Sequence, residues 1–289
     1  MKALLSGINS FTGNYLKDYL IKSGYEVYGL SYEDKFESSL ICNISDKKSV
    51  DDAIKRVKPN ILIHLAAISF VAHDDKEELY TTNILGTRNL LEAFKNIDVP
   101  HKHFIFPSTA NVYKPTNQII TENSEIAPGN DYSISKATCE NIVKIYEDYF
   151  DATILRFFNY TGLNQNTKFL IPKIVSHFIK KTEVMELGDV TVSRDFSDVR
   201  DIVKIYEKII SKNIKGLFNV CSGECYSIKK IIEICERITG HNIDVQVNKS
   251  FVRDNEIKTI IGSRDHLDKS IGPLERIKFE ETLEWMLKS

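Results

Sequence analysis

The sequence predicts an α/β fold with a doubly wound parallel sheet, followed by a smaller C-terminal region. Three observations predict it. Strand-like and helix-like segments alternate through the first half of the chain, a glycine-containing loop follows the first strand, and the alternation is lost after Asn159. Strands separated by helices form parallel βαβ units with helices on both faces of a sheet. We therefore expect a first domain over residues 1–160 and a second region over residues 161–289.

Short apolar runs between turn residues predict the strands, and apolar residues at helical spacing predict the helices. The predicted strands are Lys2–Ser6, Glu26–Ser31, Asn60–Ala67, Lys102–Thr109, Ala152–Phe158 and Leu217–Val220. The predicted helices are Thr12–Ser23, a helix capped by Ser45 that runs to Val57, Glu78–Asn96, Tyr132–Phe150, and Ser227–Thr239 with Ser227 as its cap and Gly240 past its end. Some elements after residue 160 are expected to rejoin the main sheet.

Composition excludes several classes of protein. The 289 residues have a net charge of −2, which gives no sign of a nucleic-acid partner. We expect neither a signal peptide nor a membrane span, and therefore a cytoplasmic protein. An odd number of cysteines without secretory features favours reduced thiols. Cys221 and Cys225 lack the spacing and the histidine pair of a zinc site, so no metal is expected.

The loop Gly7-Ile8-Asn9-Ser10-Phe11-Thr12-Gly13 lies between the first predicted strand and the first predicted helix. Gly7 allows a tight turn, and Gly13 allows the helix to pack closely on the strand. The helix start offers free N–H groups and a positive dipole end to a pyrophosphate. This spacing and context indicate a Rossmann-type dinucleotide site, although Ser10 replaces the middle glycine of the usual pattern.

The end of the second strand bears on the choice between NAD and NADP. An acidic residue there usually binds the free 2′-hydroxyl of the adenosine ribose in NAD. This chain has Ser31 and Tyr32 at that point, and Glu33 and Asp34 only follow. A serine does not repel a 2′-phosphate, so NADP(H) is favoured and NAD(H) stays possible. No arginine stands there to bind the phosphate.

A tyrosine and a lysine begin the helix predicted from Tyr132. Tyr132 and Lys136 are four residues apart, so both side chains lie on one helix face. A free phenol has a pKa of about 10, and a neighbouring ammonium favours its phenolate and lowers that pKa. Ser108 and Thr109 end a predicted strand, the edge where ligands bind in open α/β sheets. The three groups together predict proton transfer to a reacting oxygen.

Over essentially its whole length the chain resembles extended short-chain dehydrogenases/reductases that act on nucleotide sugars. Further motifs that support the resemblance are His64-Leu65-Ala66-Ala67, Asn83-Ile84-Leu85-Gly86-Thr87, Arg156-Phe157-Phe158-Asn159-Tyr160-Thr161-Gly162, Leu187-Gly188-Asp189, Arg194-Asp195-Phe196-Ser197-Asp198-Val199-Arg200-Asp201 and Asn219-Val220-Cys221-Ser222-Gly223. Arg253-Asp254-Asn255-Glu256 and Ile261-Gly262-Ser263 resemble the branch that holds GDP-mannose 4,6-dehydratases and GDP-6-deoxy-4-keto-mannose reductases.

The resemblance implies roles for particular residues, and it makes region 161–289 mainly a nucleotide-sugar-binding region. The catalytic set would be Thr109, Tyr132 and Lys136. The expected cofactor-binding residues are Gly7, Asn9, Ser10, Phe11, Thr12, Gly13, Ser31, Asn43, Ile44, Leu65, Ala66, Ala67, Ser108, Tyr132, Lys136 and Phe158. The expected substrate-binding residues are Ser69, Thr109, Ala110, Asn111, Asn159, Arg194, Arg253 and Glu256. Arginines suit a diphosphate because they offer fixed planar donors.

Dehydratases of this family carry acidic residues directly after the catalytic Thr or Ser, whereas this chain has Ala110 and Asn111. Neither can move a proton, so we expect simple reduction of a nucleotide-linked 4-keto-6-deoxyhexose, giving GDP-rhamnose from the GDP-linked sugar. The alternatives are a dTDP-linked substrate, a 4-epimerase or 4,6-dehydratase, and a nucleotide-sensing protein without catalysis. The resemblance also implies a homodimer formed through helices 78–96 and 132–150.

Overall fold

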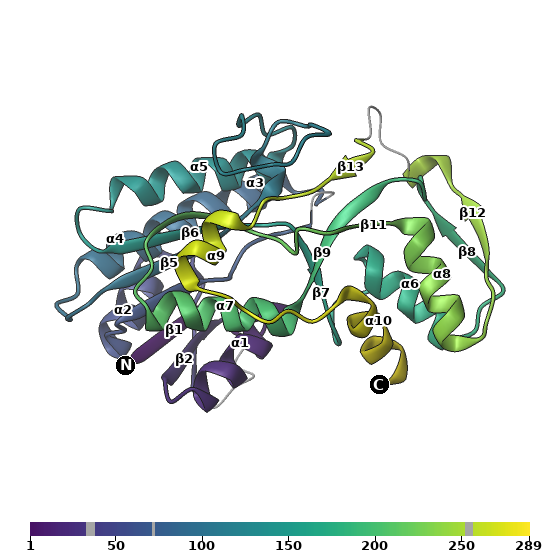
Figure 1. Ribbon diagram of the computed structural model, residues 1–289. Helices are drawn as coiled ribbons and strands as arrows, with labels where there is room; N and C mark the ends of the chain where they lie inside the picture. The colour runs from purple at the N-terminus through teal and green to yellow at the C-terminus, as the bar shows by residue number, and fades with distance from the viewer. Residues whose placement is uncertain (33–37, 71–72, 252–256) are drawn as a thin grey trace. The chain divides into compact units, whose positions relative to one another are not determined.

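The main sheet of the protein has seven strands, and the computed structural model confirms the predicted doubly wound α/β fold (Figure 1). The structure describes residues 1–32, 38–70, 73–251 and 257–289. The strand order is β10-β6-β5-β4-β1-β2-β3, and the pairings from β6 to β3 are parallel. The strands are β1 Lys2–Ser6, β2 Glu26–Ser31, β3 Ser39–Ile41, β4 Ile61–His64, β5 His103–Thr109, β6 Asp151–Phe157 and β10 Gly216–Val220.

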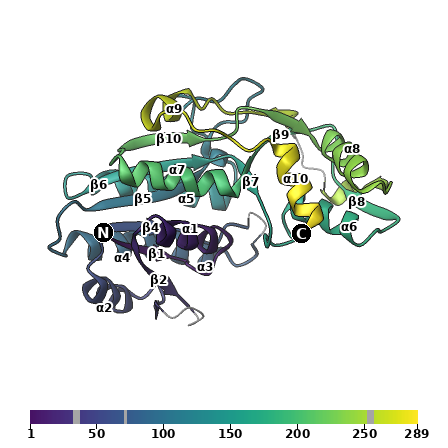
Figure 2. The ribbon, with the colours of Figure 1, turned by 60° about the horizontal axis from the view of Figure 1, so that its bottom comes forward.

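Helices cover both faces of this sheet (Figures 1 and 2). On one face, α2 (Lys47–Val57), α4 (Gly86–Lys95) and α5 (Asp131–Ile145) share an apolar core with strand residues such as Leu4 and Phe104. The alternate strand residues are also buried, and α1 (Phe11–Lys22) and α7 (Val199–Ser211) lie on the opposite face. Because both faces are buried, the strands are almost continuously apolar.

The strand order reverses between β1 and β4. From β1 the chain builds the sheet outward through β2 and β3, and then returns to place β4, β5 and β6 on the other side of β1. In open α/β sheets this switch point leaves a crevice at the carboxyl ends of the strands, where ligands bind. The loops after β1, β2 and β4 are therefore the part of the fold that positions a site.

The structure corrects three predicted helices. The segment 78–96 is helical as predicted, but the helix begins at Lys76 and contains the π-helical turn η1 (Thr81–Leu85) between α3 (Lys76–Tyr80) and α4. Apolar spacing alone does not reveal a π-turn, which inserts one residue into a helix. The cap of α2 is Asp46 rather than Ser45, since the Asp46 side chain accepts from the N–H of Lys48.

Helix α5 ends at Ile145 and not at Phe150. Asn130 caps it, and its Asn130–Ser133 capping box fixes the first turn. The chain leaves the helix after Ile145, and the rings of Tyr146 and Phe150 stack with their centroids 6.1 Å apart in the core. Core packing of these two rings therefore overrides the helical pattern.

Much of the second half forms a separate apolar core. Besides α7, the elements after Phe158 that lie outside the main sheet are β7 Asn159–Thr161, α6 Leu170–Ile179, β8 Val184–Leu187, β9 Ser193–Asp198, β11 Cys225–Ser227, α8 Ile228–Thr239, β12 Asp244–Val247, β13 Thr259–Ile260, α9 Asp265–Ile271 and α10 Phe279–Lys288. Short 3-10 turns form at η2 Ala110–Val112 and η3 Lys249–Phe251. Helices α6, α8 and α10 pack on one another around this core, and Ser227 and Gly240 cap α8 as predicted.

The chain divides into two compact units. Unit 1 is 1–114, 124–157 and 203–218, and unit 2 is 115–123, 158–202 and 219–289. Strand β10 lies after residue 160 and belongs to the seven-stranded sheet. The functional division into residues 1–160 and 161–289 stays a prediction.

Candidate active site

A pocket of about 770 Å³ in unit 1 lies at the ends of β1, β2 and β4. That volume is within the range of ligand-binding pockets. The pocket is lined by Gly7, Asn9, Ser10, Leu30, Ser31, Tyr32, Cys42, Asn43, Ile44, Ser45, Ala66, Ala67, Ile68, Asp75, Glu77, Glu78, Thr81 and Thr82. It therefore coincides with the switch point of the sheet, where the fold class places a ligand.

The loop after β1 fits the pyrophosphate of a dinucleotide. Gly7 has a φ of +72°, and a Cβ there would lie 2.8 Å from the backbone nitrogen of Ala66. A Cβ on Gly13 would lie 2.5 Å from the carbonyl oxygen of Gly7, so only glycine allows α1 to approach the loop. Ser10 caps α1, and the first turn of α1 has no acidic residue. The positive end of the helix dipole is thus available to an anion.

The end of β2 is polar but uncharged. The Nδ2 of Asn9 donates to the Oγ of Ser31 at 2.7 Å, and both residues line the pocket together with Asn43. No Lys or Arg is among the lining residues that the structure describes, while three carboxylates are: Asp75, Glu77 and Glu78. The three carboxylates come from the start of α3 and its N-cap, not from the end of β2.

Thr109 is the last residue of β5 and is almost fully buried. Its Oγ1 accepts from the backbone N–H of Asn111 at 3.2 Å and so begins the 3-10 turn η2. Ala110 and the exposed Asn111 lie in that turn. The position that follows the candidate catalytic threonine therefore has no acid or base.

Tyr132 and Lys136 lie one turn apart near the start of α5. The tyrosine is partly exposed, whereas Lys136 is only 4% exposed. Burial lowers the pKa of the Lys136 ammonium to about 8, against the opposing influence of Cys139 and Glu140. The ammonium lies 4.3 Å from the centroid of the Phe106 ring. Within the described ranges, no carboxylate forms an ion pair with it.

A buried ion pair connects the strands and the helix that hold these residues. The Glu140 carboxylate accepts from Arg156 Nη2 at 2.6 Å and Nε at 3.0 Å, and the hydroxyl of Ser108 donates to the same carboxylate. Glu140 lies one turn after Lys136 on α5, and Arg156 lies on β6. The contacts join β5, α5 and β6 next to Thr109. Ser108 therefore bonds to the protein scaffold and is absent from the pocket lining.

The predicted substrate residues fall in both units. Ser69 is exposed in unit 1, and Asn159 and Arg194 belong to unit 2. The Nδ2 of Asn159 donates to the carbonyl of Asp195 at 3.1 Å, and Nη1 of Arg194 donates to the carbonyl of Ile257 at 3.0 Å. Arg253 and Glu256 lie outside the described residues.

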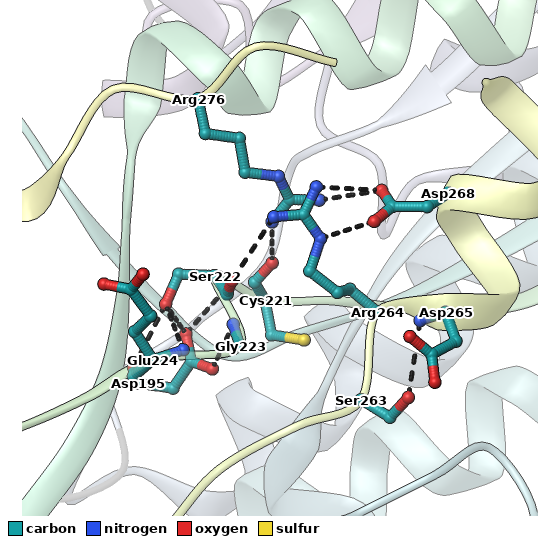
Figure 3. A network of polar contacts seen from close by, with 10 residues as sticks. All are labelled: Asp195, Cys221, Ser222, Gly223, Glu224, Ser263, Arg264, Asp265, Asp268 and Arg276. Atoms are coloured by element: carbon teal, nitrogen blue, oxygen red, sulfur yellow. Dashed lines mark hydrogen bonds and ion pairs between the residues drawn. The ribbon is translucent and has the colours of Figure 1, made fainter. Parts of the chain in front are cut away.

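Unit 2 also has a network of polar contacts (Figure 3). Asp195 accepts from the N–H and hydroxyl of Ser222, both at 2.7 Å, and from the N–H of Gly223 at 2.9 Å. Asp268 pairs with Arg264 at 2.6 Å and with Arg276 at 3.0 Å. The two arginines also donate to the backbone carbonyls of Ser222 and Cys221. This network holds the 221–223 turn and uses its charges internally.

The pocket contains half of the expected cofactor-binding residues. Those that line it are Gly7, Asn9, Ser10, Ser31, Asn43, Ile44, Ala66 and Ala67. Those that do not are Phe11, Thr12, Gly13, Leu65, Ser108, Tyr132, Lys136 and Phe158. Phe158 belongs to unit 2, where its ring occupies the space beside Gly262. The roles of all these residues stay predictions.

Sequence reasoning missed the pocket wall formed by α3 and the π-turn. Thr81 and Thr82 line the pocket together with Asp75, Glu77 and Glu78. A signal for them was present, because they directly precede the segment Asn83–Thr87 that supported the family resemblance. Among the residues that the structure describes, no group of three or more His, Cys, Asp or Glu could hold a metal ion, and no helix is long and apolar enough to cross a membrane.

Comparisons with known proteins match almost the whole chain. The family model described as GDP-mannose 4,6 dehydratase matches residues 4–286. The GDP-6-deoxy-D-talose 4-dehydrogenase of Aggregatibacter actinomycetemcomitans is 34% identical over 276 residues, which cover 94% of this chain and 92% of that one. The GDP-6-deoxy-D-mannose reductase of Pseudomonas aeruginosa is 26% identical over 299 residues, covering 99% and 96%. Other similar chains are UDP-glucose 4-epimerases.

Solved structures give the same result for the fold. The structure of RMD from Pseudomonas aeruginosa complexed with NADPH has a TM-score of 0.88 to this chain at 26% identity, covering 99% of this chain and 97% of that one.

Proposed function

Because the chain belongs to the GDP-mannose 4,6-dehydratase family, an NAD(P)-dependent family of nucleotide-sugar enzymes, we propose that it reduces the 4-keto group of a GDP-linked 4-keto-6-deoxyhexose. The observation that favours reduction over dehydration is the turn after Thr109, where Ala110 and Asn111 stand in place of an acid. Two relatives that act on GDP-6-deoxyhexoses support the GDP-linked substrate.

The proposed mechanism assigns one task to each catalytic residue. When bound, the reduced nicotinamide would supply a hydride for the reduction at C4. Tyr132 donates its phenolic proton to the 4-oxygen as negative charge develops there. The Thr109 hydroxyl donates a hydrogen bond to the same oxygen. Lys136 stabilises the phenolate that remains, because its ammonium lies one helical turn away and has no carboxylate partner among the described residues.

We propose that the pocket in unit 1 holds the cofactor. Gly7 and Ser10 would place the pyrophosphate at the start of α1, and Lys136 would bind the nicotinamide ribose. Ser31 with Asn9 would lie beside the adenosine ribose, where an uncharged pair admits a 2′-phosphate, so NADP(H) is the proposed cofactor and NAD(H) a possible one.

Replacing Ser31 tests that choice of cofactor. Ser31→Asp should raise the Kd for NADPH by about tenfold or more through repulsion of the 2′-phosphate, and leave the Kd for NADH near its wild-type value. Titration of nicotinamide fluorescence measures both, with Ser31→Asn as the uncharged control. An equal change for both cofactors would remove Ser31 from the ribose site.

We propose a role for each of the expected substrate-binding residues. Arg194 and Arg253 would bind the diphosphate, Glu256 the nucleotide ribose, and Asn159, Ser69, Ala110 and Asn111 the sugar. Arg194 suits this role because a guanidinium binds phosphate oxygens in a fixed geometry.

The configuration of the product has two candidates. The sequence predicts GDP-rhamnose, the 6-deoxymannose product. The relative that is 34% identical is a GDP-6-deoxy-D-talose 4-dehydrogenase, which favours GDP-6-deoxytalose as the second candidate. The two sugars differ only in the configuration at C4, so they result from hydride transfer to opposite faces of one ketone.

The decisive experiment mixes the purified protein with NADPH or NADH and GDP-4-keto-6-deoxymannose. We expect one reduced cofactor to be oxidised for each sugar reduced, and the proton couplings of H4 in the product distinguish the two configurations. The dTDP-linked ketone serves as the alternative substrate. An epimerase would interconvert sugars without net oxidation of cofactor, and a dehydratase would act on GDP-mannose. Binding of cofactor without turnover of any nucleotide sugar would favour a sensor.

We further propose a homodimer formed through residues 78–96 and 132–150. Ile145 and Tyr149 in the second segment are 67% and 50% exposed, which gives that surface apolar area to bury. Light scattering of the wild type and of Ile145→Glu would measure the assembly. A cytoplasmic location also stays a prediction.

A further inference from the structure

Two buried histidines of unit 1 make the same contact in different parts of the sheet. His64 is the last residue of β4, and His103 is the first residue of β5. Nε2 of each histidine lies within hydrogen-bond distance of a buried threonine hydroxyl, Thr87 at 2.9 Å and Thr153 at 2.7 Å. Each hydroxyl in turn donates to a backbone carbonyl at 2.5 Å, that of Asn83 or that of Ile214. We call these contacts the His64 link and the His103 link.

The hydrogen bonds of the His64 link determine its tautomer. The single hydroxyl proton of Thr87 is donated to the Asn83 carbonyl, so the Thr87 oxygen must accept from Nε2–H of His64. Nδ1 of His64 is then an acceptor and receives the hydroxyl proton of Ser6 at 2.7 Å. The Ser6 oxygen accepts from the N–H of Ala66, which lines the pocket. One neutral tautomer therefore satisfies every group.

Burial and a nearby positive charge also keep His64 neutral. Burial is the main cause that lowers its pKa to about 3, and the ammonium of Lys136 adds to the effect. Lys136 and His64 both lie beside the Phe106 ring, with the ammonium 4.3 Å and the imidazole centroid 5.9 Å from its centroid. The imidazole consequently does not change its charge at any pH near neutrality.

The His64 link continues into the helix that holds Tyr132. The amide of Asn83 donates to the hydroxyl of Ser135 at 3.0 Å, and that hydroxyl donates to the backbone carbonyl of Tyr132 at 2.8 Å. The thiol of Cys139 donates to the Asn83 carbonyl at 3.1 Å. Residue 83 thus bonds α5 at two points one turn apart, on both sides of Lys136 in the sequence.

The same asparagine also fixes the pocket. Its Oδ1 accepts from the N–H of Ile68 at 2.8 Å, and its Nδ2 donates to the carbonyl of Ile68 at 3.1 Å. Ile68 lines the pocket. These hydrogen bonds therefore connect the end of β1 and the loop after β4 to the turn of α5 on which the candidate proton donor lies.

We propose that Thr87 and His64 are positioning residues for Tyr132 and Lys136, acting through Asn83 and Ser135. A neutral imidazole with one fixed tautomer gives the link a single hydrogen-bond pattern. That pattern fixes the position of α5 relative to the pocket, both around and along the helix axis. The His103 link has the same chemistry, but it ends on the carbonyl of Ile214 in the loop before β10 and contacts no candidate catalytic residue. It provides a matched control within the same sheet.

The test compares Thr87→Val with Thr153→Val. Each substitution keeps the side-chain shape and removes one buried hydroxyl between an imidazole N–H and a carbonyl, so both should lower Tm by similar amounts. Thr87→Val should lower kcat about tenfold or more with little change in the Kd of the cofactor, because a misplaced donor affects chemistry more than binding. Thr153→Val should keep kcat within about twofold, and Thr87→Ser should restore it.

The activity arm depends on the proposed function, so hydrogen exchange provides an independent arm. In Thr87→Val the backbone amides at the start of α5 should exchange faster than in the wild type, whereas in Thr153→Val they should not. This result is measurable even if the wild type reduces no nucleotide sugar, in which case the proposed function fails and the positioning proposal is still decided.

Ser135→Ala removes the last bond of the chain and covers the case in which Thr87→Val does not fold. It should also lower kcat and speed exchange at the start of α5. Unchanged kcat and exchange in Ser135→Ala or in a folded Thr87→Val, or equal losses in Thr153→Val, would overturn the proposal.

Discussion

Two charged sites, one in each unit, differ in whether their charges have partners within the chain. In unit 2, Asp268 lies between Arg264 and Arg276, and Asp195 accepts hydrogen bonds from Ser222 and Gly223, so these charged groups have partners within the chain (Figure 3). In unit 1, Lys136 is almost fully buried and, in the described part of the chain, has an aromatic ring but no carboxylate within ion-pair distance.

The charges in unit 2 therefore stabilise the fold, whereas the charge of Lys136 is available to a ligand. Burying an ion without a partner costs stability, and a closed network recovers part of that cost through its hydrogen bonds. The pKa of Lys136 is lowered to about 8, because its burial outweighs the opposing influence of Cys139 and Glu140. Perturbed groups of this kind are concentrated at functional sites. Substitution of Lys136 should therefore change activity, and substitutions in the unit 2 network should change stability.

The largest expected effect follows removal of the phenolic hydroxyl. Tyr132→Phe should lower kcat by about three orders of magnitude, because the developing alkoxide loses its proton donor. The cofactor Kd and Tm should stay close to wild type. Oxidation of the reduced cofactor by the ketone measures kcat. Tyr146→Phe is the control, since Tyr146 follows the end of α5 and its hydroxyl donates to Glu92. Near-normal turnover in Tyr132→Phe would contradict the acid role.

Lys136→Met should lower the activity of the protein and raise its stability. We expect kcat to fall by about two orders of magnitude, because the phenolate loses its neighbouring cation. The free energy of unfolding should rise by roughly 2 kcal/mol at neutral pH, since an apolar side chain replaces a buried ammonium that has no ion-pair partner in the described part of the chain. Chemical denaturation measures the second quantity. A loss of stability would mean that Lys136 has a structural role like that of the unit 2 charges.

The pH dependence of activity and of stability should reflect the titration of Lys136. Since its folded pKa is about 8, kcat/KM for reduction should be level below pH 8 and fall about tenfold per pH unit above it. The folded protein releases this proton before the unfolded chain does, so stability should rise with pH from about 8 to 10.5, relative to Lys136→Met. A basic limb near pH 10 in the activity profile would show that another group controls it.

Asp268→Asn should give the smallest change in activity. The substitution keeps the shape of the side chain but leaves two partly buried arginines without their shared carboxylate. We expect the free energy of unfolding to fall by about 2 kcal/mol and kcat to stay within about twofold. Thermal unfolding and the turnover assay check both. A tenfold loss of kcat with unchanged Tm would contradict the view that the charges of the unit 2 network stabilise the fold and do not serve activity.

The sequence predicted the strands and loops of unit 1 well because their signals are local. Gly7, Gly13 and Ser10 act within one turn of chain, and the buried strands are continuous apolar runs. Prediction was weaker in unit 2, where short strands such as β13 and β7 are stabilised by pairing with the distant β9. The π-turn at Thr81–Leu85 was missed for the same reason, since Asn83 is held by Ile68, Ser135 and Cys139.

The sequence by itself determined the fold class, the dinucleotide loop, and the order of Thr109, Tyr132 and Lys136 along the chain, because backbone geometry and residue spacing suffice for these. Only the tertiary structure decided that Lys136 has no ion pair within the described residues, that His64 is held in one neutral tautomer, and that Ser108 bonds to Glu140. Charge state and hydrogen-bond partners depend on which distant residues share a buried site, and spacing along the chain does not contain that information.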